Sequence, residues 1–235
     1  MRELPGLTRR VGHKGADHVV PGNTTASFAA ALELGVDMIE FDVLPDADGT
    51  LRLAHDRGHL EGAQTLEEGL AHLTEPAYAH VDLDVDLKGV GYEERVVDAL
   101  RRHGLVERTL VSTMEAASLA RVRELEPRLR RGLSVPRIHR NWLSTPHGTA
   151  VLYAAALQAR VRYPAMLARR IRSGELTAVM AHWSLATPRM WRAVRAAGGE
   201  LYVWTVDDAT RIASLEAMGV TGVITNDPRL FEPTA

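Results

Sequence analysis

The stretch Asp37-Met38-Ile39-Glu40-Phe41-Asp42-Val43 decides how the rest of this chain is interpreted. Its apolar residues predict a β-strand, and side chains of a strand alternate between two faces. Glu40 and Asp42 therefore share one face, while the apolar residues between them share the other. Two carboxylates on an apolar strand, near its C-terminal end, favour a site for a hard cation. The alternative is an edge strand with one wet face.

The segment before this strand predicts a strand, a helix and a crossover. A short strand begins at Val11 and ends in Gly12-His13-Lys14-Gly15. A helix is expected over residues 26–34, because Asn23 or Thr24 can cap its start and Gly35 can end it. A strand–helix–strand unit of this kind implies a right-handed parallel crossover.

The segment after this strand predicts a hairpin. Only residues 44–50 separate it from the apolar run at 51–55, and they include Asp48-Gly49. This connection is too short for a parallel crossover and is typical of an antiparallel turn. The run at 51–55 should therefore return along the acid-bearing strand, which brings His55 level with Glu40 and Asp42.

A second strand with buried charge is predicted at residues 81–88, where apolar and charged residues alternate strictly. Its charged face carries Asp82, Asp84, Asp86 and Lys88. In a sandwich this face would lie in water, but in a barrel covered by helices it points inwards, where unpaired charge is costly. Asp82 and Asp84 are expected deeper in such a barrel than Asp86 and are interpreted as structural.

The same alternation of strand and helix continues to the end of the chain. Parallel strands are expected near residues 11, 39, 84, 110, 133, 180, 203 and 223, each followed by a helix or by the C-terminal segment. Eight such units predict an α/β fold, a (β/α)8 TIM barrel with a short antiparallel hairpin strand after the second barrel strand. The chain, 1–235, is expected to form a single domain.

Composition limits the classes of partner. The 235 residues include 46% hydrophobic residues and carry a formal net charge of -2, so no global charge favours a nucleic acid partner. The absence of cysteine excludes disulfides and thiolate metal sites. No apolar run reaches the length of a membrane span, so we expect no stable membrane anchor and a cytoplasmic protein. The oligomeric state is not indicated.

The predicted strand ends bring polar side chains to one rim, where active sites of such barrels are built. They are His13, Lys14, Glu40, Asp42, His55, Asp86 and Lys88. Carboxylates at 40, 42 and 86 suit one divalent cation, Mg²⁺ or Ca²⁺, with water and substrate completing its shell. Zinc is the less favoured alternative, because the two histidines are better placed for proton transfer.

A divalent cation flanked by two lysines indicates a small-molecule substrate with anionic oxygens, and phosphate esters are the commonest of these. The cation would polarise the phosphoryl oxygens. One histidine would remove a proton from the nucleophile, and the other would protonate the leaving oxygen.

Several motifs resemble those of the glycerophosphodiester phosphodiesterase family. The N-terminal signature is matched by His13-Lys14-Gly15, Pro21 to Thr24, Glu40-Phe41-Asp42-Val43 and His55-Asp56. Asp86-Leu87-Lys88 resembles the family's third metal carboxylate and following lysine. The two C-terminal signatures are similar to Val203-Trp204-Thr205-Val206-Asp207-Asp208 and Gly222-Val223-Ile224-Thr225-Asn226-Asp227-Pro228.

The resemblance implies a metal-dependent TIM barrel that hydrolyses glycerophosphodiesters to sn-glycerol 3-phosphate and an alcohol, often through a cyclic phosphate. It also implies roles for single residues: His13 and His55 as the acid/base pair, Glu40, Asp42 and Asp86 as metal ligands, and Lys14, Lys88 and Trp204 as substrate contacts.

The sequence departs from the family pattern at four places. Lys14 replaces the usual Arg and loses its bidentate fork, Gly22 replaces a Glu, and Asp86 replaces a longer Glu. The usual insertion after the His-Asp motif is mostly missing, which predicts a more open site. The missing insertion and Asp86 favour, as an alternative, a headgroup-releasing activity like that of lysophospholipase D or sphingomyelinase D. Lys14 and Gly22 favour a weakly active phosphodiester-binding domain.

The loop at 136–150 follows the fifth parallel strand and belongs on the same rim. It carries Arg137, His139, Arg140, Trp142 and His147. We expect part of this loop to contact the substrate's headgroup.

Overall fold

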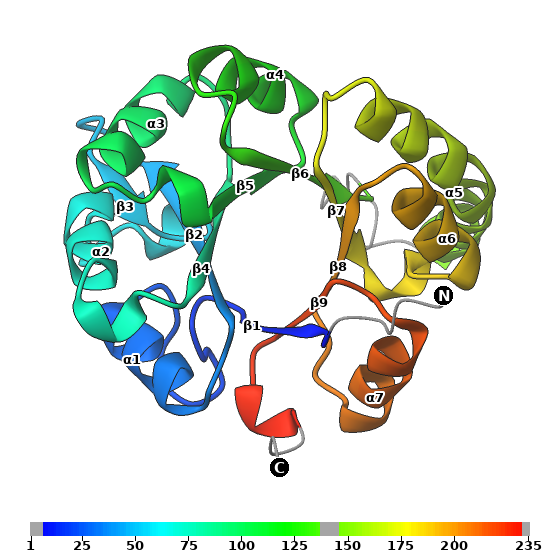
Figure 1. Cartoon of the computed structure of the whole chain (residues 1–235), viewed down its shortest axis with the longest axis horizontal. Helices are drawn as coiled ribbons and strands as arrows, with labels where there is room; N and C mark the ends of the chain where they lie inside the picture. Colours follow the sequence, from blue (N-terminus) through cyan, green and yellow to red (C-terminus); the bar gives the residue numbers. More distant parts are fainter. Residues whose placement is uncertain (1–6, 137–145, 232–235) are drawn as a thin grey trace.

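The computed structural model describes residues 7–136 and 146–231, and these form a closed barrel of parallel strands with helices around it (Figure 1). β1 (Arg9–Gly12) closes the ring, because it pairs in parallel with both β2 (Met38–Pro45) and β9 (Gly222–Thr225). The strand order around the ring is β1-β9-β8-β7-β6-β5-β4-β2. The predicted (β/α)8 fold is thereby confirmed.

The other elements follow the predicted alternation of strand and helix, and each ring strand includes or adjoins its expected position. The remaining ring strands are β4 (Asp82–Leu87), β5 (Thr109–Thr113), β6 (Arg130–Val135), β7 (Ala178–His182) and β8 (Glu200–Trp204). The helices are α1 (Thr25–Glu33), α2 (Leu66–Leu73), α3 (Glu93–Arg102), α4 (Ala116–Leu125), α5 (Pro146–Arg172), α6 (Pro188–Ala196) and α7 (Ala209–Met218). Within the two described ranges, no helix has the length and hydrophobicity of a transmembrane span.

The predicted hairpin strand is β3 (Leu51–Leu53), which lies outside the ring and runs antiparallel to the end of β2. Val43 is opposite Leu53, and the backbone N–H of Ala54 donates to the carbonyl of Asp42 at 3.2 Å. His55 therefore follows directly after a residue that is hydrogen-bonded to the acid-bearing strand.

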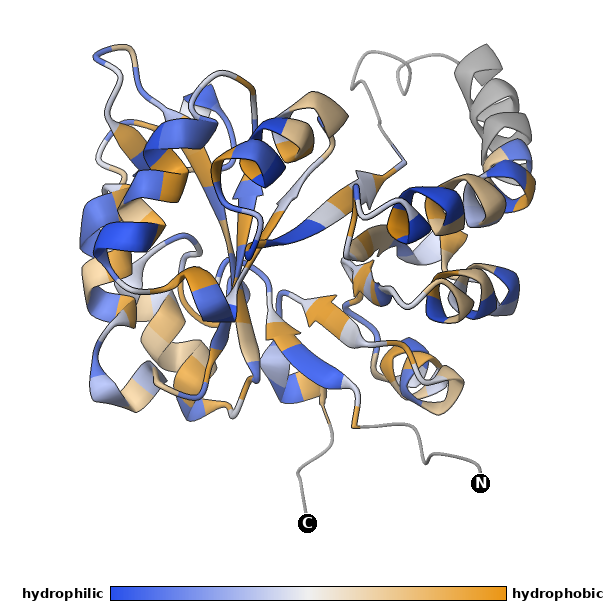
Figure 2. Cartoon of the chain, turned by 45° about the horizontal axis from the view of Figure 1, so that its top comes forward, coloured by the Kyte–Doolittle hydropathy of each residue, from blue (hydrophilic) through white to orange (hydrophobic). Residues whose placement is uncertain are grey.

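Apolar side chains fill the layer between the strands and the helices. The barrel strands carry hydrophilic as well as hydrophobic residues (Figure 2). Phe28 of α1 packs on Phe41 of β2 with ring centroids 5.4 Å apart. The side chain of Thr24 caps α1 by accepting a hydrogen bond from Ser27 N at 3.1 Å. Because the outward face of β2 is used for this packing, Glu40 and Asp42 must point into the barrel.

The inside of the barrel is layered. At its floor Asp82 accepts from Arg9 and, at 2.8 Å, from Arg130. Above this lies an apolar layer that includes Met38, Leu110, Met180, Tyr202 and Ile224. The ion pairs at the floor agree with a structural role for Asp82, and the apolar layer separates them from the rim.

The turn that carries His13 is held by close backbone approaches. His13 N donates to the carbonyl of Thr225 at 2.8 Å, and Gly15 N donates to the carbonyl of Glu40 at 3.2 Å. A Cβ on Gly12 would lie 2.1 Å from the carbonyl oxygen of Gly15, a backbone atom that cannot move aside without shifting the turn. Glycine is therefore required at position 12 by close packing.

We predict that Gly12→Ala lowers the free energy of unfolding by about 1–3 kcal/mol, because the added methyl overpacks the turn. Denaturant unfolding of the purified variant measures this loss. Gly89→Ala is the matched control: its Cβ would meet only Tyr92, at 3.5 Å, and should change stability by less than about 0.5 kcal/mol. Equal midpoints for Gly12→Ala and the parent would contradict the prediction.

Candidate active site

A cavity of about 170 Å³ opens at the rim where the strands end. Its walls combine charged, polar and apolar side chains from most of the ring strands and the turns after them. They are His13, Glu40, His55, Asp84, Asp86, Lys88, Ser112, Met114, Ser134, Met180, Trp204, Thr205 and Ile224. Most of the residues predicted for a site are therefore brought to one place, although they are separated by up to 191 positions along the chain.

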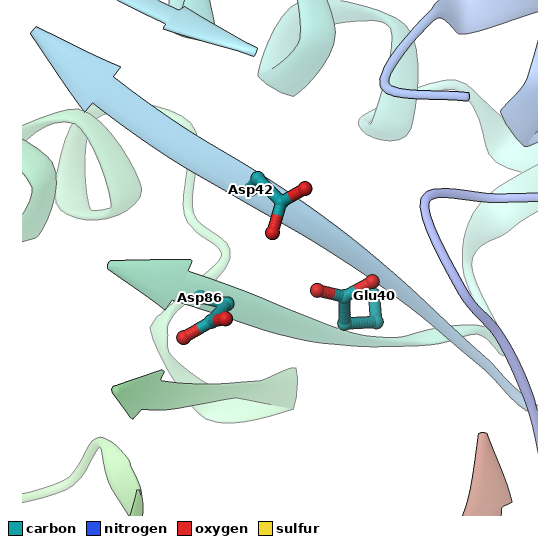
Figure 3. Close-up of side chains that lie close together, drawn as sticks. All are labelled: Glu40, Asp42 and Asp86. Atoms are coloured by element: carbon teal, nitrogen blue, oxygen red, sulfur yellow. The ribbon is translucent and has the colours of Figure 1, made fainter. Parts of the chain in front are cut away.

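Three carboxylates face one another at this rim, Glu40 and Asp42 on β2 and Asp86 on β4 (Figure 3). One oxygen of each lies within 4.8 Å of the others. The parallel register explains this, because Asp42 is directly opposite Asp86 on the neighbouring strand. Glu40 and Asp42 are buried, at 4% and 0% exposure.

Lys88 provides positive charge to two of these acids. Its Nζ lies 2.6 Å from Asp42 Oδ1 and also contacts Asp86 Oδ2. Although burial opposes ionisation, Lys88 and His55 hold the pKa of Asp42 well below its usual range. Asp86 and Asp42 raise the pKa of Lys88 against the effect of burial.

The positive charge of Lys88 does not balance the negative charge of the three acids. Burial and the neighbouring charge of Asp42 raise the pKa of Glu40 well above its ordinary value, and burial also raises that of Asp86. Clustered oxygen donors that repel one another in a buried place are the donor set that a hard divalent cation requires. Glu40, Asp42 and Asp86 therefore fit such an ion.

Asn23 fixes the orientation of Asp42. Its Nδ2 donates to Asp42 Oδ2 at 2.9 Å, and its Oδ1 accepts from Asp42 N at 2.9 Å. Asn23 adopts a left-handed backbone (φ 57°), which asparagine tolerates better than most residues. His55 Nδ1 lies 3.2 Å from the same Oδ2, so Asp42 also orients this imidazole.

His13 is oriented by a different chain of contacts. Its Nδ1 lies 2.5 Å from Asn226 Oδ1. Asp207 holds Asn226 by accepting from its Nδ2 at 2.6 Å and from its backbone N–H at 2.9 Å. Because the amide nitrogen faces Asp207, the amide oxygen must face His13, and Nδ1 then carries the proton. The other ring nitrogen, Nε2, lies 3.7 Å from Oε2 of Glu40. Burial lowers the pKa of His13.

The two remaining predicted substrate contacts lie differently. Trp204 lines the cavity, and its Nε1 donates to the carbonyl of Met180 at 2.8 Å. The Lys14 ammonium lies 3.4 Å from Asp17 Oδ2, and this side chain is not among those that line the cavity. The backbone N–H of Lys14 instead donates to Glu40 Oε2 at 2.8 Å.

The predicted headgroup loop falls mostly outside the described residues. Arg137, His139, Arg140 and Trp142 lie in 137–145, and His147 belongs to the first turn of α5, where side chains are not described. Its contact with a headgroup stays a prediction.

Sequence reasoning did not assign roles to Asn23, Asp207 and Asn226. All three lie inside the motifs that carry the family resemblance, so the motifs were the available signal. Asp84 was interpreted as structural, yet it lines the cavity.

Comparison with known proteins gives a consistent result. Residues 13–74 and 80–230 match the model of the glycerophosphoryl diester phosphodiesterase family. A curated glycerophosphodiester phosphodiesterase from Caldanaerobacter subterraneus is 25% identical over 93% of both chains. One from Bacillus subtilis is 23% identical over 97% of this chain and 86% of its own.

Solved structures share the fold. A glycerophosphodiester phosphodiesterase from Parabacteroides distasonis superimposes with a TM-score of 0.73 at 18% identity, over 94% of both chains. A phosphodiesterase from Oleispira antarctica, in complex with the product sn-glycerol-3-phosphate, gives 0.72 at 20% identity over 95% of this chain and 94% of its own.

We predict that Asn226→Ala removes the fixed tautomer of His13, because nothing then accepts from Nδ1–H. Long-range ¹H–¹⁵N spectra of the imidazoles should show a protonated Nδ1 in the parent and lose that signature in the variant. Asp208→Ala is the control: Asp208 caps α7 by accepting from Arg211 N at 2.7 Å, and its loss should leave the His13 signals unchanged. An unaltered Nδ1–H signal in Asn226→Ala would refute the assignment.

Proposed function

Because this chain belongs to the glycerophosphoryl diester phosphodiesterase family, we propose that it hydrolyses glycerophosphodiesters to sn-glycerol 3-phosphate and an alcohol. Family membership confirms the resemblance in the sequence and supports a phosphoric diester hydrolase. The observation that carries the proposal is the rim cavity, where two imidazoles and an ammonium surround three clustered carboxylates.

We propose that Glu40, Asp42 and Asp86 hold one divalent cation, Mg²⁺ or Ca²⁺, since carboxylate oxygens suit both. When bound, the cation supplies positive charge opposite the phosphoryl oxygens of the substrate. Lys88, already seated between two of the carboxylates, adds a second positive charge on the same side. Both charges would stabilise the negative charge that develops on phosphorus-bound oxygen.

The two histidines are held by partners of different charge, which supports different roles. Asn226 is neutral and leaves Nε2 of His13 able to accept a proton from the attacking hydroxyl. Asp42 is a carboxylate that orients His55 through its Nδ1, and this imidazole is the one we propose to donate a proton to the leaving oxygen. We therefore assign His13 as the base and His55 as the acid of the first step.

A glycerol hydroxyl next to the phosphate would be the first nucleophile, giving a cyclic phosphate that water then opens. In this second step His55 would take the proton of water and His13 would return its proton to the glycerol oxygen, which restores both histidines. Trp204 offers an apolar wall to the carbon chain of glycerol. Lys14 stays a proposed substrate contact that would have to leave Asp17.

A second candidate is release of headgroups from lysolipids, which would need an apolar surface on the rim. Val19, Val90 and Trp183 follow three ring strands and are 39%, 61% and 39% exposed, so they lie on the rim. The connection from β3 to α2 spans only residues 54–65, and the missing family insertion would leave this rim more open. The weakly active binding domain is disfavoured, because both histidines and all three acids reach the cavity or its edge.

We expect metal-dependent release of glycerol 3-phosphate from glycerophosphocholine and glycerophosphoethanolamine. The assay compares these with lysophosphatidylcholine and bis(p-nitrophenyl) phosphate, each with Mg²⁺, with Ca²⁺ and with EDTA. Because the acids need a cation, EDTA should abolish turnover and the active ion should restore it. Turnover confined to the lysolipid would establish the second candidate, and no turnover with either ion would support the binding domain.

His13→Ala and His55→Ala should each lower kcat by about 100-fold or more with the preferred diester, because each removes a proton-transfer group. Steady-state kinetics measures this. His103→Ala is the control, since His103 pairs with Glu67 at 2.9 Å on the outer surface and should retain parental kcat. Parental activity in His13→Ala would show that the assignment of the base is wrong.

A further inference from the structure

Asp84 is a buried acid that the proposed reaction does not use. It is 1% exposed, and neither of its carboxylate oxygens makes a hydrogen bond of normal geometry to the described residues, although the Ser112 hydroxyl lies near enough to favour its charged form. It nevertheless lines the cavity. A buried carboxyl group without a partner is costly to the fold, so its retention at a cavity wall indicates a ligand that supplies the missing partner.

The position of Asp84 in the barrel sets the depth of this feature. Asp84 lies opposite Glu40 on the neighbouring strand and two residues before Asp86 on its own. Two residues of parallel strand rise by about 6.6 Å, so Asp84 lies about one side-chain layer below the proposed cation ligand Asp86. A ligand that reaches Asp84 therefore extends inwards from the place where the phosphate is proposed to bind.

The side chains around Asp84 define the chemistry of that ligand. Ser112 and Ser134 bring hydroxyls from the next two strands, and both line the cavity. The apolar part of the lining comes from Met180, Ile224 and Trp204. Acceptors and hydroxyls on one side and apolar atoms on the other match a polyol, whose O–H groups and C–H faces need these two kinds of partner.

We propose that Asp84, Ser112 and Ser134 form an inner subsite that binds the hydroxyl groups of the substrate's glycerol moiety, with Asp84 accepting from a hydroxyl. The subsite rests on the proposed function for the identity of the polyol, but its existence can be tested by binding alone. It explains why a carboxyl group is kept in the apolar interior, and it makes Asp84 a determinant of specificity.

The test is isothermal titration of the full-length protein in the presence of Mg²⁺ with glycerol 3-phosphate, inorganic phosphate and phosphoethanolamine. In the parent, glycerol 3-phosphate should bind at least tenfold more tightly than phosphate. Asp84→Leu should lower the affinity for glycerol 3-phosphate about tenfold and leave the affinity for phosphate within twofold of the parent, since only the hydroxyl contact is lost. Asp84→Asn, which keeps an acceptor, should lose less.

Tyr202→Phe is the matched control. Its hydroxyl is also buried and without a partner in the described structure, but Tyr202 does not line the cavity, so all three affinities should stay parental. Retained phosphate binding in Asp84→Leu shows that the variant is folded, and its thermal stability should equal or exceed that of the parent because an unpaired buried acid is removed.

Three results would overturn the subsite: equal affinity of the parent for phosphate and glycerol 3-phosphate, an equal loss of both in Asp84→Leu, or a loss confined to phosphoethanolamine, which would indicate an ammonium ligand. None of these depends on turnover. A parent that binds glycerol 3-phosphate through Asp84 but hydrolyses no diester would support the subsite while contradicting the proposed function.

Discussion

The burial of negative charge at the carboxyl ends of β2 and β4 is the constraint on which the site depends. Helices cover the outside of the barrel, so the acids of these strands point inwards, where a carboxylate needs donors or positive charge. Asp42 is wholly buried and takes both kinds of partner. Lys88 supplies positive charge, and Asn23 donates a hydrogen bond from the segment before α1. The hairpin brings His55 next to the same carboxylate. The raised pKa values of Glu40 and Asp86 indicate that their negative charge is not fully compensated by the protein, and this suits a cation.

The two histidines, which we propose as the base and the acid, are held by different partners. Both meet the cavity, and both are held through Nδ1, but His13 meets a neutral amide and His55 meets a carboxylate. Asp207 lies behind the amide and fixes which of its ends faces the imidazole. The partners of the two imidazoles thus differ in charge, although each is fixed through the same ring nitrogen.

Local patterns in the sequence predicted most of the fold, because strand and helix periods are properties of neighbouring residues. The short Asp-Gly connection after Val43 predicted β3 and the return of His55, and alternation at 81–88 predicted which side chains of β4 face inwards. Three positions escaped such reasoning. They are Asn23, Asp207 and Asn226, whose partners are 19 or more positions away. The alternation of neighbouring residues carries no information about such pairs.

The sequence by itself determined the barrel, the carboxylates that could hold a cation and the histidines near them, because each follows from strand order and alternation. Only the tertiary structure decided how these groups are charged and aimed. Register placed Asp42 opposite Asp86, ring closure brought Asn226 to His13, and packing left Asp84 without a partner at the cavity wall. These outcomes depend on distances between strands far apart in the chain, and such distances exist only once the ring is closed.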